Sequence, residues 1–311
     1  MSTTAASVST RSRTAWFFFL LALASLMWSA QGTAVKVLDR HLGPIAITFL
    51  PFYVTTVLFI PLLLKMRRET PGAENPSAKD WIQFVIAGVA GQVLAQLGMT
   101  WGISKSLAAN GAILNLLIPV ISAVLASILL KERITALRVS ALAIGLAGVG
   151  LMSVSDWRQA SFGEMRYLTG NLLIFAGCIG SSFYNVYCKG LMRRFTEIEI
   201  LIFSYITASL ASIPLLIWAE PFSFTSFERF DWRSWAAFAF LALFMYGASM
   251  LLFFKALQHL DVTTASASLY LVPVFGVLLA AVVLGERLNR SAMTGAAIVL
   301  FATVLIMKYE S

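Results

Sequence analysis

The chain has few charged residues and only two cysteines, and both shortages narrow what it can be. Only 12% of its 311 residues are charged and 59% are hydrophobic, which excludes a water-soluble globular protein, because soluble proteins carry about 25% charged residues. The 23 Lys and Arg exceed the 15 Asp and Glu, but they are scattered between long uncharged segments, so nucleic-acid binding through a basic stripe is excluded as well. Cys178 and Cys188 are roughly 15 Å apart on one predicted helix, too far for a disulfide bond.

Long apolar segments occupy almost the whole chain. A hydrocarbon core of about 30 Å is crossed by about 20 helical residues, and ten segments reach that length. They are residues 14–35, 45–64, 81–103, 107–130, 136–154, 168–188, 198–218, 232–254, 262–284 and 291–307. The short connections leave no room for a soluble domain. The sequence therefore predicts an all-α integral membrane protein with ten transmembrane helices.

The basic residues predict the orientation of these spans. The side that holds both termini collects 14 Lys and Arg, and the other side collects 9. Since cytoplasmic loops are enriched in Lys and Arg, both termini are expected in the cytoplasm. We expect a multi-pass protein of the bacterial inner membrane.

The second half of the chain repeats the first at an offset of 153 or 154 residues. The matched pairs are Trp81 with Trp235, Pro119 with Pro273, Glu132-Arg133 with Glu286-Arg287, and Lys36 with Lys189. The two expected units are residues 14–154 and 168–307. Each has five spans, so the second must enter the membrane from the opposite side. Inverted repeats around a central cavity are typical of secondary transporters, in which the halves open the cavity to either side in turn.

The same residues carry a family resemblance. Each half has a proline within its fourth span, a following Leu-x-Glu-Arg and a fifth span rich in Gly and Ala. In this the chain resembles the ten-helix branch of the drug/metabolite transporter superfamily, with two EamA-type repeats, and within it the bacterial exporters of aromatic amino acids. The resemblance implies a central cavity in which spans three, four, eight and nine are prominent. Ser29 after Trp28 departs from the glycine that many members carry.

No Asp or Glu lies in the middle of a predicted span. A charge at that depth costs about 2.5–3.5 kcal/mol and usually marks function, and exporters of organic cations rely on such a carboxylate. A neutral or zwitterionic substrate is therefore expected. The prolines Pro61, Pro119, Pro214 and Pro273 permit bends, and the small residues Gly88, Gly91, Ala95, Ala141, Gly145 and Gly148 predict close helix packing.

Uncharged polar and aromatic residues are the candidates for the binding cavity. Gln92 and Gln96 share one face of span three, and their repeat mates are Tyr246 and Met250 on span eight. The expected substrate-binding residues are Trp28, Gln31, Gln92, Gln96, Asn110, Tyr184, Tyr246 and Ser268. Lys255 and Lys189 are candidates for a gate or for a partner of a substrate carboxylate. The competing interpretation is an interhelical hydrogen bond for each polar residue and a headgroup contact for each lysine.

The leading hypothesis is a secondary transporter that exports aromatic and other neutral amino acids, or related metabolites, by alternating access. An exchanger of phosphate esters or nucleotide sugars is the alternative within the superfamily, with Lys255 or Lys189 as the phosphate ligand, and a channel is the alternative of another class. An enzyme is not expected, because the chain has two His, no H-E-x-x-H and no deep pair of carboxylates. No cofactor or metal is expected. The expected partners are a small solute and the lipid bilayer, with no nucleic acid, and a monomer is the working expectation.

Overall fold

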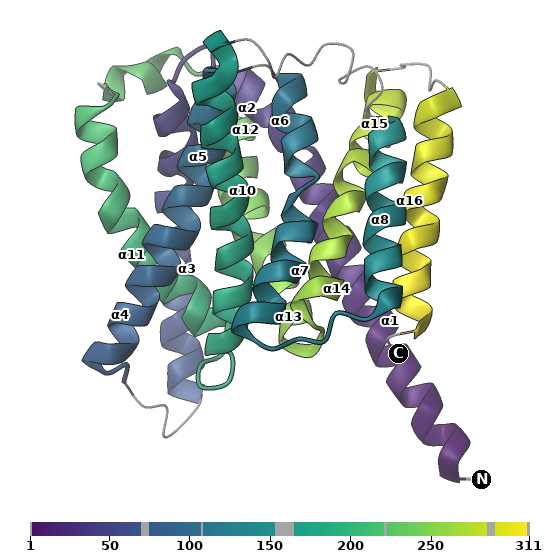
Figure 1. The fold of residues 1–311 in the computed structure, drawn as a ribbon. Helices are drawn as coiled ribbons and strands as arrows, with labels where there is room; N and C mark the ends of the chain where they lie inside the picture. Colours follow the sequence, from purple (N-terminus) through teal and green to yellow (C-terminus); the bar gives the residue numbers. More distant parts are fainter. Residues whose placement is uncertain are drawn as a thin grey trace.

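The protein is one bundle of helices in which both chain ends lie at the same side (Figure 1). The computed structural model describes residues 2–69, 75–106, 108–152, 165–220, 223–284 and 290–309, and every secondary-structure element in these ranges is helical. Chain ends on one side require an even number of crossings. The all-helical membrane fold predicted from the apolar segments is confirmed, and we call the side with both ends the termini face.

The helices of the first half are α1 (Ser2–Ser29), α2 (Gln31–Leu38), α3 (Pro44–Glu69), α4 (Ala78–Ile86), the π-helix η1 (Ala87–Val93), α5 (Leu94–Ser104), α6 (Ala108–Asn115), α7 (Ile118–Leu129) and α8 (Ala136–Met152). Those of the second half are α10 (Met165–Leu191), α11 (Glu197–Trp218), the 3₁₀ turn η2 (Phe224–Arg229), α12 (Trp232–Phe240), the π-helix η3 (Leu241–Ala248), α13 (Ser249–His259), α14 (Val262–Ala267), the 3₁₀ turn η4 (Ser268–Tyr270), α15 (Leu271–Leu284) and α16 (Arg290–Tyr309). Among the described residues, five helical stretches are long and apolar enough to cross a membrane, and shorter apolar helices make up most of the other spans.

Interruptions occur at matched positions of the two halves. The π-helices η1 and η3 begin at residues 87 and 241, which differ by the 154 residues of the sequence repeat. The fourth span breaks between α6 and α7, and the ninth breaks at η4. Proline explains both breaks, because its ring clashes with the carbonyl four residues earlier, at Asn115 for Pro119 and at Leu269 for Pro273.

The four prolines differ in effect, which refines the expectation of bends. Pro61 and Pro214 lie inside the continuous helices α3 and α11. Pro119 and Pro273 instead lie in the first turns of α7 and α15, where the missing N–H has no cost.

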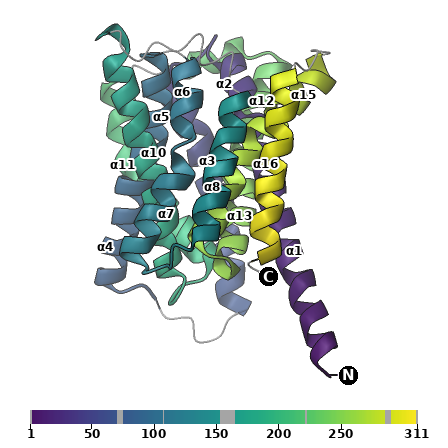
Figure 2. The same ribbon diagram turned by 45° about the vertical axis from the view of Figure 1, so that its right-hand side comes forward.

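Matched spans run in opposite directions through the bundle. In Figures 1 and 2, α4 lies near the termini face and leads up to α5, whereas its counterpart α12 lies at the far face and leads down to α13. The chain likewise descends from α6 to α7 and ascends from α14 to α15. The halves thus have inverted topology.

Each half packs its first span against the other half. Helix α10 contacts α5 and α7 of the first half, and α1 contacts α13 and α15, which are their counterparts. The bundle therefore contains two interlocked groups, one built from α4–α7 and α10 and the other from α12–α15 and α1. Helices α3 and α11 pack together, as do α8 and α16.

Glycines set the closest approach between helices. A Cβ on Gly98 of α5 would lie 2.7 Å from Gly177 Cα of α10, and one on Gly148 of α8 would lie 2.9 Å from the Gly295 carbonyl of α16. Gly88 and Gly145 are equally close to neighbouring helices. These contacts agree with the close packing expected from the small residues.

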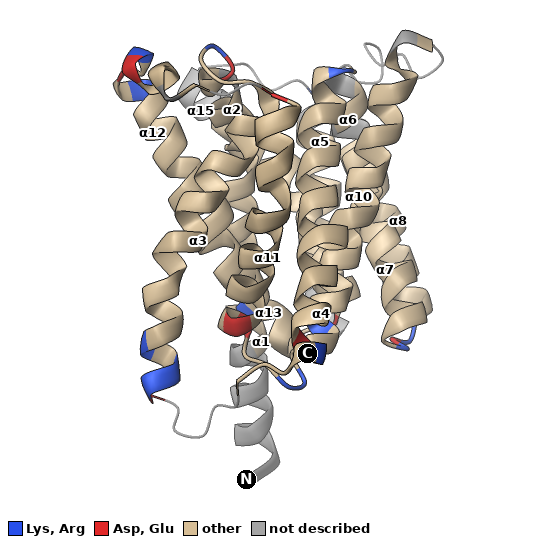
Figure 3. Ribbon diagram, turned by 90° about the vertical axis from the view of Figure 1, so that its left-hand side faces the viewer, with Lys and Arg blue, Asp and Glu red and all other residues tan. Residues whose placement is uncertain are grey.

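Charged residues gather at the two ends of the bundle in the described part of the chain (Figure 3). The helices between those ends carry none at the middle. Capping boxes begin two spans at the termini face, Ser77 with Asp80 for α4 and Thr196 with Glu199 for α11. In the described part of the chain, the middle of the bundle is therefore formed by uncharged side chains.

Candidate substrate site

Two amides and two hydroxyls meet in the middle of the bundle. The Gln96 side chain donates to Gln92 Oε1 over 3.3 Å, and the Tyr184 hydroxyl of α10 bonds Ser204 Oγ of α11 at 2.8 Å. Gln92 also lies beside the Tyr184 hydroxyl. Gly91 makes room for this tyrosine, since a Cβ there would lie 2.8 Å from its ring. The structure therefore brings together three residues that the sequence singled out separately.

Aromatic rings continue this polar centre toward the second half. Tyr184 stacks on Phe254, with ring centroids 5.5 Å apart. The Tyr205 hydroxyl donates to the Tyr246 carbonyl over 2.9 Å. The Phe52 ring packs against the rings of Tyr205 and Tyr246, with centroid distances of 4.2 Å and 5.4 Å.

Trp28 joins the same surface from α1. Its ring lies 5.4 Å from that of Phe253, which in turn neighbours Phe254. We call the whole set the amide–aromatic cluster: Trp28, Phe52, Gln92, Gln96, Tyr184, Ser204, Tyr205, Tyr246, Phe253 and Phe254. In the part of the chain that the structure describes, none of these side chains bonds a charged side chain. The cluster thus offers amides and hydroxyls to a polar head and rings to an apolar group.

Both π-helices contribute to this cluster. Gln92 lies in η1 and Tyr246 in η3, and both side chains are buried. A π-helix is rare and widens the backbone locally, and such segments occur often at functional sites. The two halves therefore face the centre of the bundle with equivalent distortions but different side chains.

Sequence reasoning missed Phe52, Ser204, Tyr205 and Phe254. Phe52, Ser204 and Phe254 lie in spans whose other residues are mostly apolar or small, so the local pattern does not separate them from residues that face lipid. Tyr205 carried the clearest signal, because a tyrosine in the middle of a span needs a partner for its hydroxyl.

Asn110 lies apart from the cluster. Its side-chain amide donates to Asn171 Oδ1 of α10 over 2.9 Å and to Ser106 Oγ over 3.1 Å. Ser106 also bonds Asn171. This network fastens the start of α6 to α10 at the face opposite the termini, which matches the alternative of an interhelical hydrogen bond.

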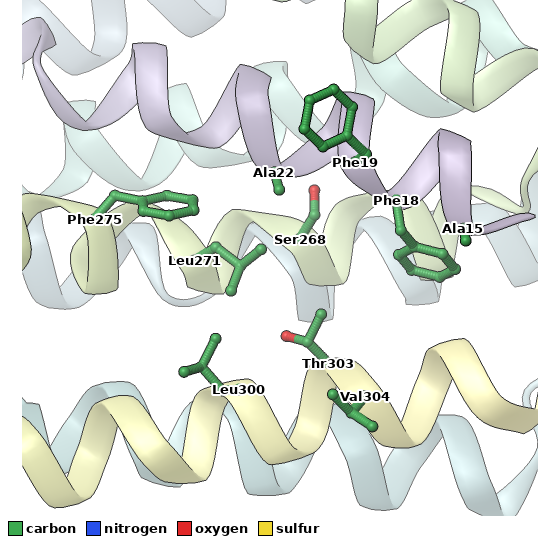
Figure 4. Close-up of a pocket in the computed structure, with 10 residues that line it drawn as sticks. All are labelled: Ala15, Phe18, Phe19, Ala22, Ser268, Leu271, Phe275, Leu300, Thr303 and Val304. Carbon is green, nitrogen blue, oxygen red and sulfur yellow. The ribbon is translucent and has the colours of Figure 1, made fainter.

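Ser268 lies at a second location, a cavity of about 320 Å³ between α1, α15 and α16 (Figure 4). The other lining residues are Ala15, Phe18, Phe19, Ala22, Leu271, Phe275, Leu300, Thr303 and Val304. The Ser268 hydroxyl donates to the Ala265 carbonyl over 2.7 Å, and Thr303 donates to its own helix. Since Phe19, Leu300 and Val304 are exposed, this apolar cavity opens at the outer surface of the bundle and away from the cluster.

The remaining candidates lie near the ends of helices. Gln31 begins α2 and is partly exposed. Lys255 is exposed on α13. The Lys189 ammonium donates to the carbonyls of Leu257 at 2.6 Å and Gln258 at 3.1 Å. Lys189 therefore neutralises the carbonyl end of α13, where a helix dipole favours a cation.

Within the described residues, no group of three His, Cys, Asp or Glu is placed to hold a metal ion. Both cysteines are buried and free. The cluster presents hydrogen-bonding groups beside aromatic rings, the two kinds of group that line most small-molecule sites.

Known proteins resemble this chain over nearly its full length. A "Probable terminal-alkyne amino-acid exporter" from Streptantibioticus cattleyicolor is 25% identical over 287 residues, covering 92% of this chain and 91% of that protein. An "S-adenosylmethionine uptake transporter" from Rickettsia bellii is 24% identical over 302 residues, covering 94% and 93%. A crystal structure of another protein matches with a TM-score of 0.76 at 20% identity, over 92% of this chain and 94% of that one, and shows the same fold.

The EamA-like transporter family matches the chain twice, over residues 15–154 and 168–308. Family and relatives indicate a membrane transporter of small molecules and not an enzyme. Because the two matches take in nearly the whole sequence, the protein belongs to the EamA-like transporter family.

Proposed function

We propose that this transporter exports neutral amino acids, aromatic ones among them, or closely related metabolites, and that the amide–aromatic cluster binds them. One observation carries the proposal: two amides and three tyrosines meet at the bundle centre, and none of them bonds a charged side chain of the described residues. A zwitterionic head can bond the amides of Gln92 and Gln96, while an apolar side chain packs on the rings. The named exporter among the relatives supports the direction of transport.

The proposed mechanism is alternating access by the units 14–154 and 168–307, with both termini in the cytoplasm of a bacterial cell. Their inverted repeat supports two equivalent end states, one open to each side. Transport by this mechanism needs no covalent step. The concentration gradient of the substrate alone is sufficient to drive it.

The phosphate-ester alternative is less well supported by the geometry. It assigns the phosphate to Lys189 or Lys255, but the first is bonded to two carbonyls and the second is exposed on α13. A phosphate group needs charged donors, and the cluster has none.

The test is counterflow in vesicles that contain the purified protein. We expect saturable exchange of phenylalanine, leucine or methionine, and competition by neutral amino acids but not by phosphorylated solutes. Competition by phosphorylated solutes alone would refute the substrate class, and flux without saturation or counterflow would indicate a channel.

A matched pair of variants tests the location of the site. Gln96→Leu removes the amide at nearly constant volume and should raise KM roughly tenfold, the effect of about 1.4 kcal/mol for one lost polar contact. Gln83→Leu changes a residue of the same span outside the cluster and should leave KM unchanged. Equal KM values for the two variants would place the binding site elsewhere.

A further inference from the structure

The turn between α13 and α14 is held at three points, by α10, by the segment that follows α7 and by α8. The first is the contact of Lys189 with the last carbonyls of α13 described above. The second comes from Glu132, whose carboxylate accepts from the Val262 N–H at 2.8 Å and from the Thr263 hydroxyl at 3.0 Å. Glu132 thus caps α14 in the opposite half and not α8, the helix that follows it in sequence.

The third contact is an ion pair between Arg138 of α8 and Asp261 in the turn. The Arg138 side chain is 12% exposed and that of Asp261 is 47% exposed. A second guanidinium nitrogen of Arg138 donates to the Arg133 carbonyl over 3.1 Å, which orients the group. A partly buried, oriented pair contributes more than a solvated surface pair.

These contacts lie on the termini-face side of the cluster. Lys189 follows Tyr184 on α10 by five residues, about 7.5 Å along the helix axis. The turn belongs to the group that contains α13 and α14, whereas Lys189 belongs to the group that contains α10. Moving the turn away from α10, from the segment that follows α7 and from α8 requires all three contacts to break.

The sequence repeat supplies the residues of the Arg138–Asp261 pair only once. At the offset of 154 residues that matches Glu132 with Glu286, Arg138 corresponds to Ala292 and Asp261 corresponds to Leu107. The equivalent turn between spans three and four therefore cannot form the same ion pair.

We propose that the α13–α14 turn is the gate of the termini face, and that the Arg138–Asp261 pair is a latch that biases the resting transporter toward closure there. The proposal rests on alternating access as the function of the bundle. It assigns to two residues outside the substrate site a control over which side the empty carrier faces.

The experiment measures access to Cys188, which is fully buried beside Tyr184 and directly precedes Lys189. With Cys178→Ser as background, a membrane-impermeant maleimide is applied to each side of oriented vesicles in turn. Arg138→Gln should accelerate labelling of Cys188 from the termini side roughly three- to tenfold, the population shift expected from losing one partly buried ion pair. Labelling from the opposite side should fall or stay unchanged.

Controls separate a latch from a general loss of structure. Exchanging the charges with Arg138→Asp and Asp261→Arg should return the rate toward that of the background. Lys65→Gln breaks the exposed pair of Lys65 with Glu69 on the same face and should have no effect. If Arg138→Gln lowers the melting temperature, Asp261→Asn provides the same test at a more exposed position. Equal labelling rates for these variants and Lys65→Gln would overturn the proposal. Because labelling needs no substrate, the test of the latch can succeed or fail whether or not the protein exchanges amino acids in the counterflow assay.

Discussion

The contact between α5 and α10 offers a quantitative test of how glycine positions two spans. Replacing Gly98 by Ala adds a Cβ that would lie 2.7 Å from the Gly177 Cα, the Gly177 nitrogen and the Leu173 carbonyl oxygen. All three neighbours are backbone atoms, so no side chain can rotate away. The helices must separate by several tenths of an ångström along their contact.

The expected magnitude follows from two opposing terms. Alanine in a helix interior gains about 1 kcal/mol over glycine, whereas forcing a methyl group into a closely packed interface costs about 1–3 kcal/mol. Three backbone contacts below 3.0 Å place Gly98→Ala at the upper end of that cost, so we expect a net loss of roughly 1–2 kcal/mol. In chains of this size that lowers the melting temperature by about 2–8 °C.

The assay is thermal unfolding of the purified protein in detergent, compared with Gly150→Ala. A Cβ at Gly150 of α8 would have no heavy atom within 4 Å, so this control should melt at or above the wild-type temperature. Gly177→Ala should reproduce the loss from the other side, because its Cβ would meet the Met99 nitrogen at 2.8 Å. A Gly98→Ala protein that melts no lower than the wild type would refute the reasoning.

Two further predictions concern single polar groups. Tyr205→Phe removes the hydrogen bond from the Tyr205 hydroxyl to the Tyr246 carbonyl and should lower the free energy of unfolding by about 1 kcal/mol. The control Tyr187→Phe changes a partly exposed ring and should lower it by less. Equal melting temperatures for the two variants would contradict this prediction. Hydrogen bonds from Ser234 hold the pKa of Asp231, the N-cap of α12, below its usual range. The stability from this carboxylate is therefore complete above the unfolded-state pKa of about 3.9 and is lost as the pH falls through the lower folded-state value. Asp231→Asn should melt lower than the wild type at neutral pH, with a difference that shrinks in acid, and a difference independent of pH would rule out the carboxylate as the cause.

The position of Asn110 shows why side-chain partners were hard to predict. Asn110 and Ser268 were favoured together as cavity residues, yet one bonds Asn171 and the other lines a cavity at the outer surface. In a helix of a soluble protein, the polar face shows which side is turned to the solvent. Here both the lipid side and the interior of the bundle are apolar, so the sequence of a span hardly indicates which of its faces is turned to lipid. Gln92, Gln96 and Tyr184 face the interior of the bundle because amides and phenols need partners that lipid cannot supply, and their role in substrate binding stays a prediction.

The sequence by itself determined the spans, their duplication in opposite orientation and the absence of charge at the centre. These properties are local: crossing the hydrocarbon demands a run of apolar residues, and five spans per repeat demand inversion. Only the tertiary structure decided that α1 packs against helices of the second half and α10 against helices of the first. The same holds for the cap that Glu132 provides to a helix of the other half and for the ion pair between Arg138 and Asp261. Such contacts join residues more than a hundred positions apart, and they depend on how closely small residues let each pair of helices approach, which no single span records.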